Sequence, residues 1–321
     1  MTPPAFWQQD GLWPRLLSPA SHVTLWLTAR RIARPGWRAP VPVLCCGNAG
    51  VGGAGKTTLV LDLAARFIAR GVRVHCLTRG YRGRALRGDR GGVWRVQPTD
   101  RADWVGDEPL LLAEMAPTWV CRDRAAGARA AVAAGAELIL MDDGLQNPTL
   151  LRTASLLVVD GAVGFGNGRV LPAGPLREPV AAAAARCRAA VLIGADATGA
   201  RAALGMLPVL TARLVPDAAL PAVRVLAFAG IGRPAKFFDT VREAGAVVVA
   251  TRSFPDHHAY LDRELRELFS CAESMFATPV TTPKDAMRLS LDEREQVQVL
   301  GVKLRWDDEA ALERLLTEVT S

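Results

Sequence analysis

Hydrophobic residues form short runs that alternate with stretches of helical periodicity from residue 41 onward. Strands are predicted at residues 41–48, 72–80, 118–122, 136–144, 154–161 and 187–195. Residues 56–71, 108–116 and 123–135 carry apolar positions three or four residues apart, which is typical of helices. Several of the strands are apolar on both faces, as in parallel sheets covered by helices. The pattern therefore predicts an α/β protein with a mostly parallel sheet.

A proline-interrupted segment near residues 208–222 separates these elements from a second set. Residues 223–260 again alternate as strand, turn, helix and strand. We therefore expect a core domain over residues 39–220 and a smaller C-terminal α/β domain over residues 221–321. Residues 1–38 differ from both parts and form a separate N-terminal segment.

The N-terminal segment is rich in tryptophan and arginine. It holds four of the eight tryptophans and five arginines against one acid, Asp10. Residues 21–37 predict a basic amphipathic helix that ends at Pro35-Gly36. Such a helix suits a bilayer interface, with its rings at headgroup depth and its arginines on anionic lipid. The alternative is a terminal helix packed on the core domain with its aromatic rings buried. No apolar run of about 20 residues predicts a membrane span.

Composition narrows the class of partner. The chain has 321 residues, half of them hydrophobic, and a formal net charge of +7. This charge favours anionic partners such as phosphates or anionic lipid. No motif that reads RNA or DNA accompanies it, so we expect no nucleic-acid partner. The six cysteines lack the spacing of a zinc site and indicate a reducing compartment.

The most specific motif is GVGGAGKT at residues 50–57. It matches the P-loop pattern G-x-x-x-x-G-K-[ST], follows a predicted strand and opens a predicted helix. We expect Lys56 to contact the β- and γ-phosphates and Thr57 to bind Mg²⁺. The phosphate-binding residues are then Gly50, Val51, Gly52, Gly53, Ala54, Gly55, Lys56, Thr57 and Thr58. Residue 51 is not the lysine of partition-type ATPases and no N-K-x-D motif selects guanine, so ATP is the expected nucleotide.

A second motif follows the buried strand at residues 136–144. Asp142 and Asp143 stand at its carboxyl end, where P-loop enzymes place the acid that holds Mg²⁺. We expect Asp142 to be the closer of the two to the ion. The alternative is an ordinary Asp-Gly turn after a strand.

Other motifs are less specific by themselves. GDEP at residues 106–109 could cap a helix, and TRGYRGR at 78–84 could bind an anion or be a solvated loop. Residues 166–179 form a long Gly/Pro-rich loop, which usually means function or disorder. His257 and His258 are adjacent, and on an extended segment their side chains would point apart, which argues against one shared metal ion.

Taken together, these motifs resemble the tetraacyldisaccharide 4′-kinase (lipid A 4′-kinase) family. The matches follow one order along most of the chain and include TRGYRG, GDEP, DDGLQN, LPAGPLREP, AGIGRPAKFF, FPDHHAY and TTPKDAMRL. The resemblance implies transfer of the ATP γ-phosphate to the 4′-hydroxyl of a tetraacylated glucosamine disaccharide 1-phosphate. It implies a peripheral protein at the cytoplasmic face of the inner membrane, with a site in a cleft between two domains.

The resemblance also assigns roles to residues. Asp107 would be the base for the sugar hydroxyl, assisted by His257, while Lys56 serves the phosphates. Residues on motifs for the disaccharide or its phosphate are Arg79, Tyr81, Gln146 and Arg177. Two positions depart from the family: Asn147 replaces a histidine and Pro283 replaces a glutamate.

A second reading is a membrane-recruited P-loop ATPase or switch protein with no lipid acceptor. The N-terminal helix fits both readings. The kinase needs a base of its own for the acceptor, whereas a switch protein needs only water.

Overall fold

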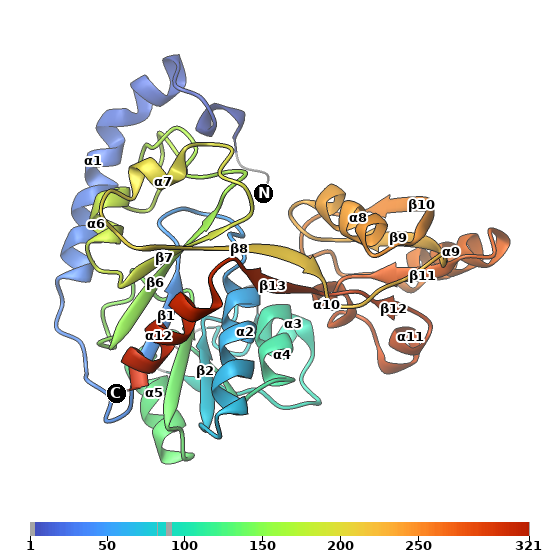
Figure 1. Ribbon diagram of the computed structural model, residues 1–321, viewed down its shortest axis with the longest axis horizontal. Coiled ribbons are helices and arrows are strands. Elements are labelled where there is room, and N and C mark those ends of the chain that lie inside the picture. The colour runs from blue at the N-terminus through green and yellow to red at the C-terminus, as the bar shows by residue number, and fades with distance from the viewer. Residues whose placement is uncertain (1–3, 82, 88–91, 321) are drawn as a thin grey trace.

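The computed structural model describes residues 4–81, 83–87 and 92–320 and has two lobes of unequal size (Figure 1). We call the part built on a nine-stranded sheet the large lobe and the part built on a four-stranded sheet the small lobe. The strand orders are β13-β8-β7-β6-β1-β5-β2-β4-β3 and β10-β9-β11-β12. The predicted α/β class with a mostly parallel sheet is confirmed: within the described residues, only β3 and β13 pair antiparallel to their neighbours in the large sheet.

The strands of the large sheet are β1 (Val43–Gly47), β2 (Val74–Thr78), β3 (Val93–Arg95), β4 (Thr118–Cys121), β5 (Leu138–Asp142), β6 (Ala154–Asp160), β7 (Ala189–Ile193), β8 (Val209–Pro216) and β13 (Val302–Trp306). The helices of this lobe are α1 (Leu12–Ile32), α2 (Lys56–Ala69), α3 (Ala102–Val105), α4 (Asp107–Ala113), α5 (Arg124–Ala133), α6 (Val180–Ala184), α7 (Ala200–Ala203) and α12 (Glu309–Thr320), with a 3₁₀ turn at Ala5–Trp7.

The small lobe contains β9 (Arg224–Ala229), β10 (Val247–Ser253), β11 (Thr278–Thr281) and β12 (Gln298–Val299). Its helices are α8 (Pro234–Glu243), α9 (Asp262–Ser274), α10 (Pro283–Ala286) and α11 (Leu291–Glu295).

Two faces of the large sheet are covered by separate hydrophobic clusters. One contains β-strand residues such as Leu44 and Leu140 together with Phe67 of α2 and Leu316 of α12. The other contains Ile139 and residues of α5. Strands β1 and β5 are fully buried, which explains why their sequences are apolar up to Asp142 at the end of β5.

The chain returns to the large lobe at its end. Strand β13 pairs with β8 from Val302↔Pro216 to Trp306↔Ala212, and α12 packs on α2 through Leu312 and Leu316. The predicted unit of residues 221–321 therefore contains about twenty residues that lie with the large lobe. Pairing between strands distant in sequence has no local signal, which is why periodicity alone placed them elsewhere. The division into residues 1–38, 39–220 and 221–321 otherwise stays a prediction.

Helix α1 runs along the outside of the large lobe (Figure 1). It begins nine residues earlier than the predicted residues 21–37, although Pro14 and Pro19 lie inside it. Pro14 is in the first turn, where its missing N–H would have no helical acceptor. Trp13 and Trp26 are 63% and 58% exposed, so these two rings are not buried as the packed alternative required. No helix among the described residues has both the length and the apolar character needed to cross a bilayer.

Candidate functional site

The P-loop connects the buried strand β1 to helix α2, as the sequence predicts. Gly52 and Gly55 have φ angles of +117° and +85°, which residues with a side chain rarely adopt. Gly55 is the N-cap of α2, and a Cβ there would lie 2.8 Å from Ile193 Cδ1. Backbone N–H groups at the start of a helix form a natural phosphate site. The residues expected to bind phosphate, 50–58, lie in this turn and in the first turn of α2.

Lys56 is folded back over the loop. Its Nζ donates to Asn48 Oδ1 at 3.2 Å and to the Gly52 carbonyl at 3.4 Å. These neutral acceptors hold the ammonium group beside the P-loop, where it can contact bound phosphate.

Thr57 and Asp142 form the metal-binding candidate. Thr57 Oγ1 donates to Asp142 Oδ2 at 3.0 Å, and both residues are buried. The other carboxylate oxygen, Asp142 Oδ1, is buried and has no hydrogen-bond partner among the residues that the structure describes. Burial and the charge of Glu108 raise the pKa of Asp142 to about 7, which indicates a carboxylate short of positive charge. A hydroxyl and a carboxylate oxygen are ligands that Mg²⁺ prefers, so these residues fit the ion.

Asp143 lies in a different polar cluster from Asp142. Arg177 Nη1 donates to Asp143 Oδ1 at 3.1 Å and to Gln146 Oε1 at 3.2 Å. Gln146 Nε2 donates to the buried Glu178 at 2.8 Å. Burial alone would raise the pKa of Asp143, but Lys56 and Arg177 hold it below its usual range. The structure thus brings Gln146 and Arg177 together, as members of a network with Asp143.

The loop before α6 carries Arg177 to the P-loop. Val51 N donates to the Pro175 carbonyl at 2.9 Å, and Arg177 N donates to the Ala49 carbonyl at 2.8 Å. The predicted Gly/Pro-rich loop therefore packs against the residues on either side of Gly50. This contact explains how a segment without regular structure is held in place.

Arg79 and Tyr81 follow the carboxyl end of β2. Burial and the neighbouring guanidinium groups of Arg124, Arg31, Arg177 and Arg122 lower the pKa of Arg79. A cluster of guanidinium groups this close together is suited to bind an anionic ligand. Tyr81 is 58% exposed, and its ring centroid lies 5.8 Å from that of His257.

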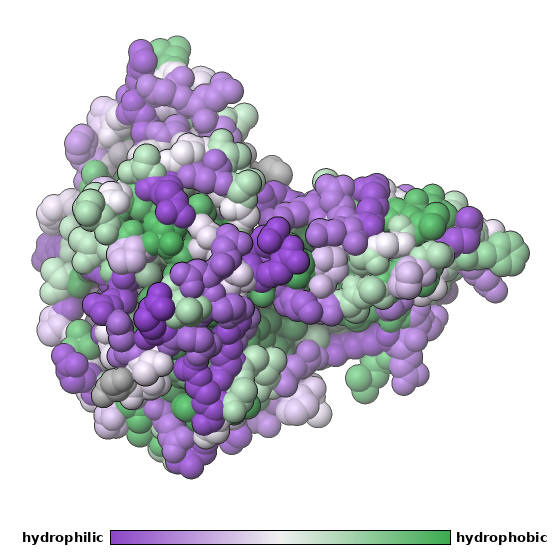
Figure 2. All heavy atoms as spheres, in the orientation of Figure 1, coloured by the Kyte–Doolittle hydropathy of each residue, from purple (hydrophilic) through white to green (hydrophobic). Residues whose placement is uncertain are grey.

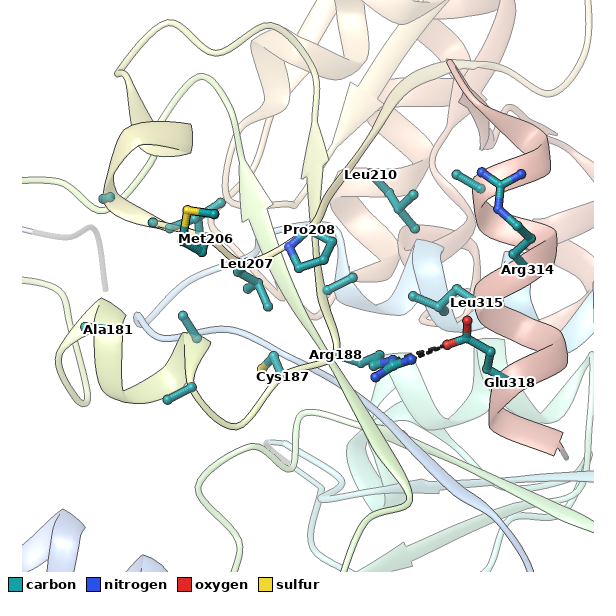
Figure 3. A pocket seen from close by; sticks show the side chains of 17 residues that line it. Ala181, Cys187, Arg188, Met206, Leu207, Pro208, Leu210, Arg314, Leu315 and Glu318 are labelled. Carbon is teal, nitrogen blue, oxygen red and sulfur yellow. Dashed lines mark hydrogen bonds and ion pairs between the residues drawn. The ribbon is translucent and has the colours of Figure 1, made fainter.

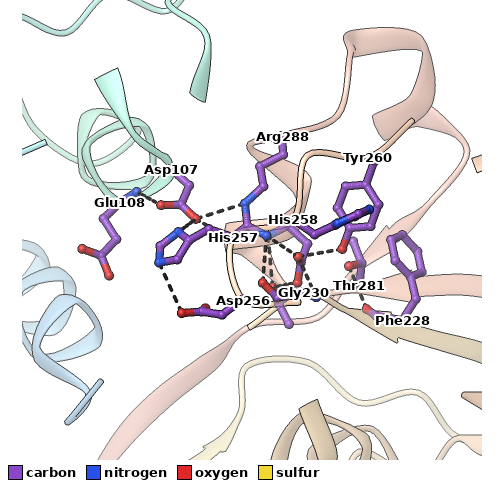
Figure 4. Close-up of polar contacts among 12 residues, drawn as sticks. Asp107, Glu108, Phe228, Gly230, Asp256, His257, His258, Tyr260, Thr281 and Arg288 are labelled. Carbon is purple, nitrogen blue, oxygen red and sulfur yellow. Dashed lines mark hydrogen bonds and ion pairs between the residues drawn. The ribbon is translucent and has the colours of Figure 1, made fainter. Parts of the chain in front are cut away.

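Asp107 and His257 meet at the junction of the two lobes (Figure 4). Asp107 is the first residue of α4 in the large lobe, and His257 follows β10 in the small lobe. Asp107 Oδ2 lies 2.9 Å from His257 Nδ1 and accepts a hydrogen bond from Arg288 Nε at 3.1 Å. Burial would raise the pKa of Asp107, but the hydrogen bond with His257 and the charge of Arg288 lower it far below its usual range.

His257 has an unusual backbone conformation, with φ of +58°. Its N–H donates to the Gly230 carbonyl at 2.9 Å, which helps to hold this turn. Asp143 has a similar φ of +56°. Such conformations are rare outside glycine and collect at functional sites.

The adjacent His258 has another role. Its Nε2 lies 2.7 Å from Glu264 Oε2, and its ring stacks on Phe254 with centroids 4.9 Å apart. These contacts support the small lobe. The two histidines therefore have different surroundings, as predicted, but not because the segment is extended: the chain turns at His257, whose φ is +58°.

The two family departures are explained locally. Asn147 Oδ1 accepts from Thr149 N at 3.0 Å and from Thr149 Oγ1 at 2.8 Å, so its amide shapes the loop after β5. Pro283 is the first residue of α10, a position that favours proline. Its neighbour Lys284 pairs with Glu108 across the lobes.

Sequence reasoning missed Arg288 and Glu108. Arg288 lies within the TTPKDAMRL motif, but 181 residues separate it from Asp107. Glu108 is the second acid of GDEP, and the motif gives it no role distinct from that of Asp107. No local pattern reveals an ion pair between two lobes.

A groove of about 790 Å³ lies elsewhere on the large lobe, among α6, α7, the start of β8 and α12 (Figure 3). Small and apolar residues such as Ala184, Leu207 and Leu315 line it, and Arg188 pairs with Glu318 across it. It borders the amino ends of β7 and β8. Ligands of open parallel sheets bind at the carboxyl ends, where the P-loop is, so this groove is not the candidate site.

Comparisons with known proteins agree with this geometry. The profile of the family described as tetraacyldisaccharide-1-P 4′-kinase matches residues 13–321. A tetraacyldisaccharide 4′-kinase of Gluconacetobacter diazotrophicus is 57% identical over 98% of this chain and 97% of its own length. That of Rhodospirillum centenum is 51% identical over 100% of this chain and 97% of its own.

A solved structure is also similar. The crystal structure of LpxK from Aquifex aeolicus in complex with ATP has a TM-score of 0.78 and 26% identity, covering 97% of this chain and 100% of that one. The motifs, the shared fold and the extent of these matches lead to one conclusion. The chain belongs to the tetraacyldisaccharide 4′-kinase family.

Proposed function

We propose that this protein transfers the γ-phosphate of ATP to the 4′-hydroxyl of a tetraacylated glucosamine disaccharide 1-phosphate in lipid A biosynthesis. The family membership supports this activity, because the relatives are named for it. The ATP complex of the similar structure supports the donor. The observation that carries the proposal is the Asp107–His257 pair, which gives the site an acid/base group separate from the P-loop.

The separate acid/base pair favours a kinase over a switch protein. A P-loop ATPase that hydrolyses ATP needs only an ordered water, whereas a kinase must orient an acceptor hydroxyl. Asp107 and His257 join the two lobes, and Figure 2 shows the surface hollowed where the small lobe leaves the large lobe. An acceptor bound near this junction would have its hydroxyl beside a carboxylate.

The site residues then divide into those that bind the phosphate donor, ATP, and those that orient the acceptor hydroxyl. Phosphoryl transfer passes through a loose transition state, so positioning and charge stabilisation dominate. Lys56 and the P-loop amides hold the phosphates. Asp107 orients the 4′-hydroxyl and, with His257, receives its proton late in the reaction, an effect of about 10²–10⁴-fold for general-base catalysis.

Arg79, Tyr81, Gln146 and Arg177 form the acceptor-binding candidates. Arg79 and Arg177 supply positive charge for the 1-phosphate, and Tyr81 is exposed beside His257. Gln146 holds Arg177 through its amide oxygen. These residues connect the lobe junction with the P-loop side of the site.

We propose that Mg²⁺ is held by Thr57 and Asp142, with Asp143 nearby. The unpartnered Asp142 Oδ1 supports this assignment. Magnesium held by these residues would supply positive charge to offset the charge that develops during phosphoryl transfer. The residues' own part is to supply a hydroxyl and a carboxylate oxygen from two adjoining elements, α2 and β5.

We also propose that the protein is peripheral, at the cytoplasmic face of the inner membrane. Exposed apolar side chains of α1 support docking on a lipid surface; they are Leu12, Trp13, Leu16, Val23, Trp26 and Leu27. Their spacing by three, four and seven residues puts most of them on one side of the helix. Docked on the lipid surface, the protein would encounter its acylated substrate there.

One assay tests the activity. The protein is incubated with γ-labelled ATP, MgCl₂ and a tetraacyldisaccharide 1-phosphate in detergent micelles. We expect label on the lipid, and omission of MgCl₂ with added EDTA should abolish it. Label found only as free phosphate would favour the ATPase alternative.

A further inference from the structure

Arg288 connects the small lobe to Asp107 through two nitrogen atoms. Nε and Nη2 both donate to Asp107 Oδ2, the first at 3.1 Å. The side chain of Arg288 is 6% exposed and that of Asp107 is 4% exposed. A buried contact through two guanidinium nitrogen atoms fixes the orientation of the Asp107 carboxylate and also neutralises its charge.

The other end of the guanidinium is anchored. Arg288 Nη1 donates to Asp285 Oδ1 at 2.8 Å and to the Gly230 carbonyl at 2.9 Å. Asp285 is fully buried and also accepts from Tyr260 at 2.7 Å and Thr282 at 2.6 Å. Because so many bonds hold Asp285, the orientation of Arg288 is set by the small-lobe core.

The two carboxylate oxygens of Asp107 have different contacts. Oδ2 meets three nitrogen atoms, from Arg288 and His257. Oδ1 accepts a hydrogen bond from Glu108 N at 3.0 Å, and this is its one hydrogen bond among the described residues. A carboxylate oxygen can accept two hydrogen bonds, so Oδ1 has capacity left for a hydroxyl.

We infer that Arg288 is a positioning residue, which holds Asp107 by one oxygen and leaves the other directed to the acceptor hydroxyl. This inference rests on the proposed kinase activity. Arg288 acts through Asp107 and touches no reacting atom. Other charged groups around Asp107 are Glu108 on α4, His257 and Asp256 after β10, and Lys284 and Asp285 on α10.

The test compares Arg288→Ala and Arg288→Lys with Arg233→Ala. Arg233 forms another ion pair between the lobes, with Asp160, and does not contact Asp107. It therefore controls for loss of lobe contact. Each variant is assayed for lipid phosphorylation with and without methylguanidinium, and its folding and ATP binding are checked by thermal shift.

We expect Arg288→Ala to lower kcat by about 10²-fold, as for a misplaced catalytic group. KM for ATP and lipid should stay within about threefold, because transition-state positioning rather than binding is lost. Methylguanidinium should restore part of the kcat of this variant and leave that of Arg233→Ala unchanged. Arg288→Lys should stay below wild type, since an ammonium keeps the charge without the fork.

Three results would overturn the inference. They are wild-type kcat in Arg288→Ala, full activity in Arg288→Lys, or an equal, unrescued loss in Arg288→Ala and Arg233→Ala. If Arg288→Ala does not fold, the kcat of Arg288→Lys tests the inference instead. A wild-type protein that labels no lipid would instead contradict the proposed function.

Discussion

At the scale of residues, Asp107 shows how the environment of a carboxylate limits its chemistry. A buried, unpaired carboxyl would have a raised pKa, yet His257 and Arg288 reverse that direction. Asp107 is therefore ionised at neutral pH and is a weak base. This suits a reaction in which the hydroxyl proton leaves late, because orientation then matters more than basicity.

The first prediction concerns turnover. Asp107→Ala should lose lipid phosphorylation by about 10²-fold or more, the lower range for general-base groups. ATP binding should be retained, since the P-loop and its contacts do not include Asp107. Turnover is measured with labelled ATP, and ATP binding by the rise in Tm. Unchanged turnover would remove Asp107 from catalysis.

The second prediction concerns stability and pH. The pKa of Asp107 is lower in the folded protein than the unfolded value of about 3.9, so its ionisation stabilises the fold above that pH. This contribution is lost as the pH falls through the folded pKa. The difference in unfolding free energy between wild type and Asp107→Asn should therefore be largest near neutral pH and shrink below about pH 4.

Urea denaturation at a series of pH values measures this difference. Asp239→Asn is the control, because Asp239 pairs with Arg242 at the surface and its side chain is 76% exposed. Such a pair contributes between about 0 and 1 kcal/mol. A difference for Asp107→Asn that grows on acidification would contradict the assigned direction.

At the scale of elements, sequence patterns predicted what local chemistry determines. The P-loop, the buried strand before Asp142 and the helices α2 and α5 each have a local signal, of glycine placement or apolar spacing. The pairing of β13 with β8 has none, because its partners are about 90 residues apart. The same holds for Arg288, whose role depends on where two lobes meet. The early start of α1 has no clear local signal either, because Pro14 and Pro19 lie within its first turns.

The third prediction tests whether α12 belongs to the large lobe. Leu312 and Leu316 are fully buried in the cluster that contains Phe67 of α2. Leu316→Ala should reduce the unfolding free energy by about 2–5 kcal/mol, as for buried leucines. Leu315→Ala, at a half-buried position on the same helix, should cost clearly less. Similar costs for both would show that α12 does not pack as described.

At the scale of the whole molecule, the N-terminal segment is joined to the loop that reaches the P-loop. Ser21 Oγ donates to the Val170 carbonyl at 2.7 Å, and Trp7 Nε1 donates to the Pro172 carbonyl at 3.0 Å. Removing residues 1–38 would break these contacts as well as the apolar face of α1. Point variants on the exposed face therefore give a cleaner test of membrane docking than truncation.

The fourth prediction uses such variants. Trp13→Ala with Trp26→Ala should weaken binding to vesicles of phosphatidylethanolamine and phosphatidylglycerol by at least about tenfold, because each lost ring removes interfacial apolar area. Raising NaCl to 0.5 M should also weaken the binding of the wild-type protein, because Arg30 and Arg31 lie in the last turn of α1 and salt screens their attraction to anionic lipid.

Met206→Ala is the matched control, because Met206 is 98% exposed beside the groove of Figure 3. Flotation measures binding, and activity in micelles checks that the double variant is folded. Equal flotation of the double variant and wild type would place the lipid-binding surface elsewhere on the molecule.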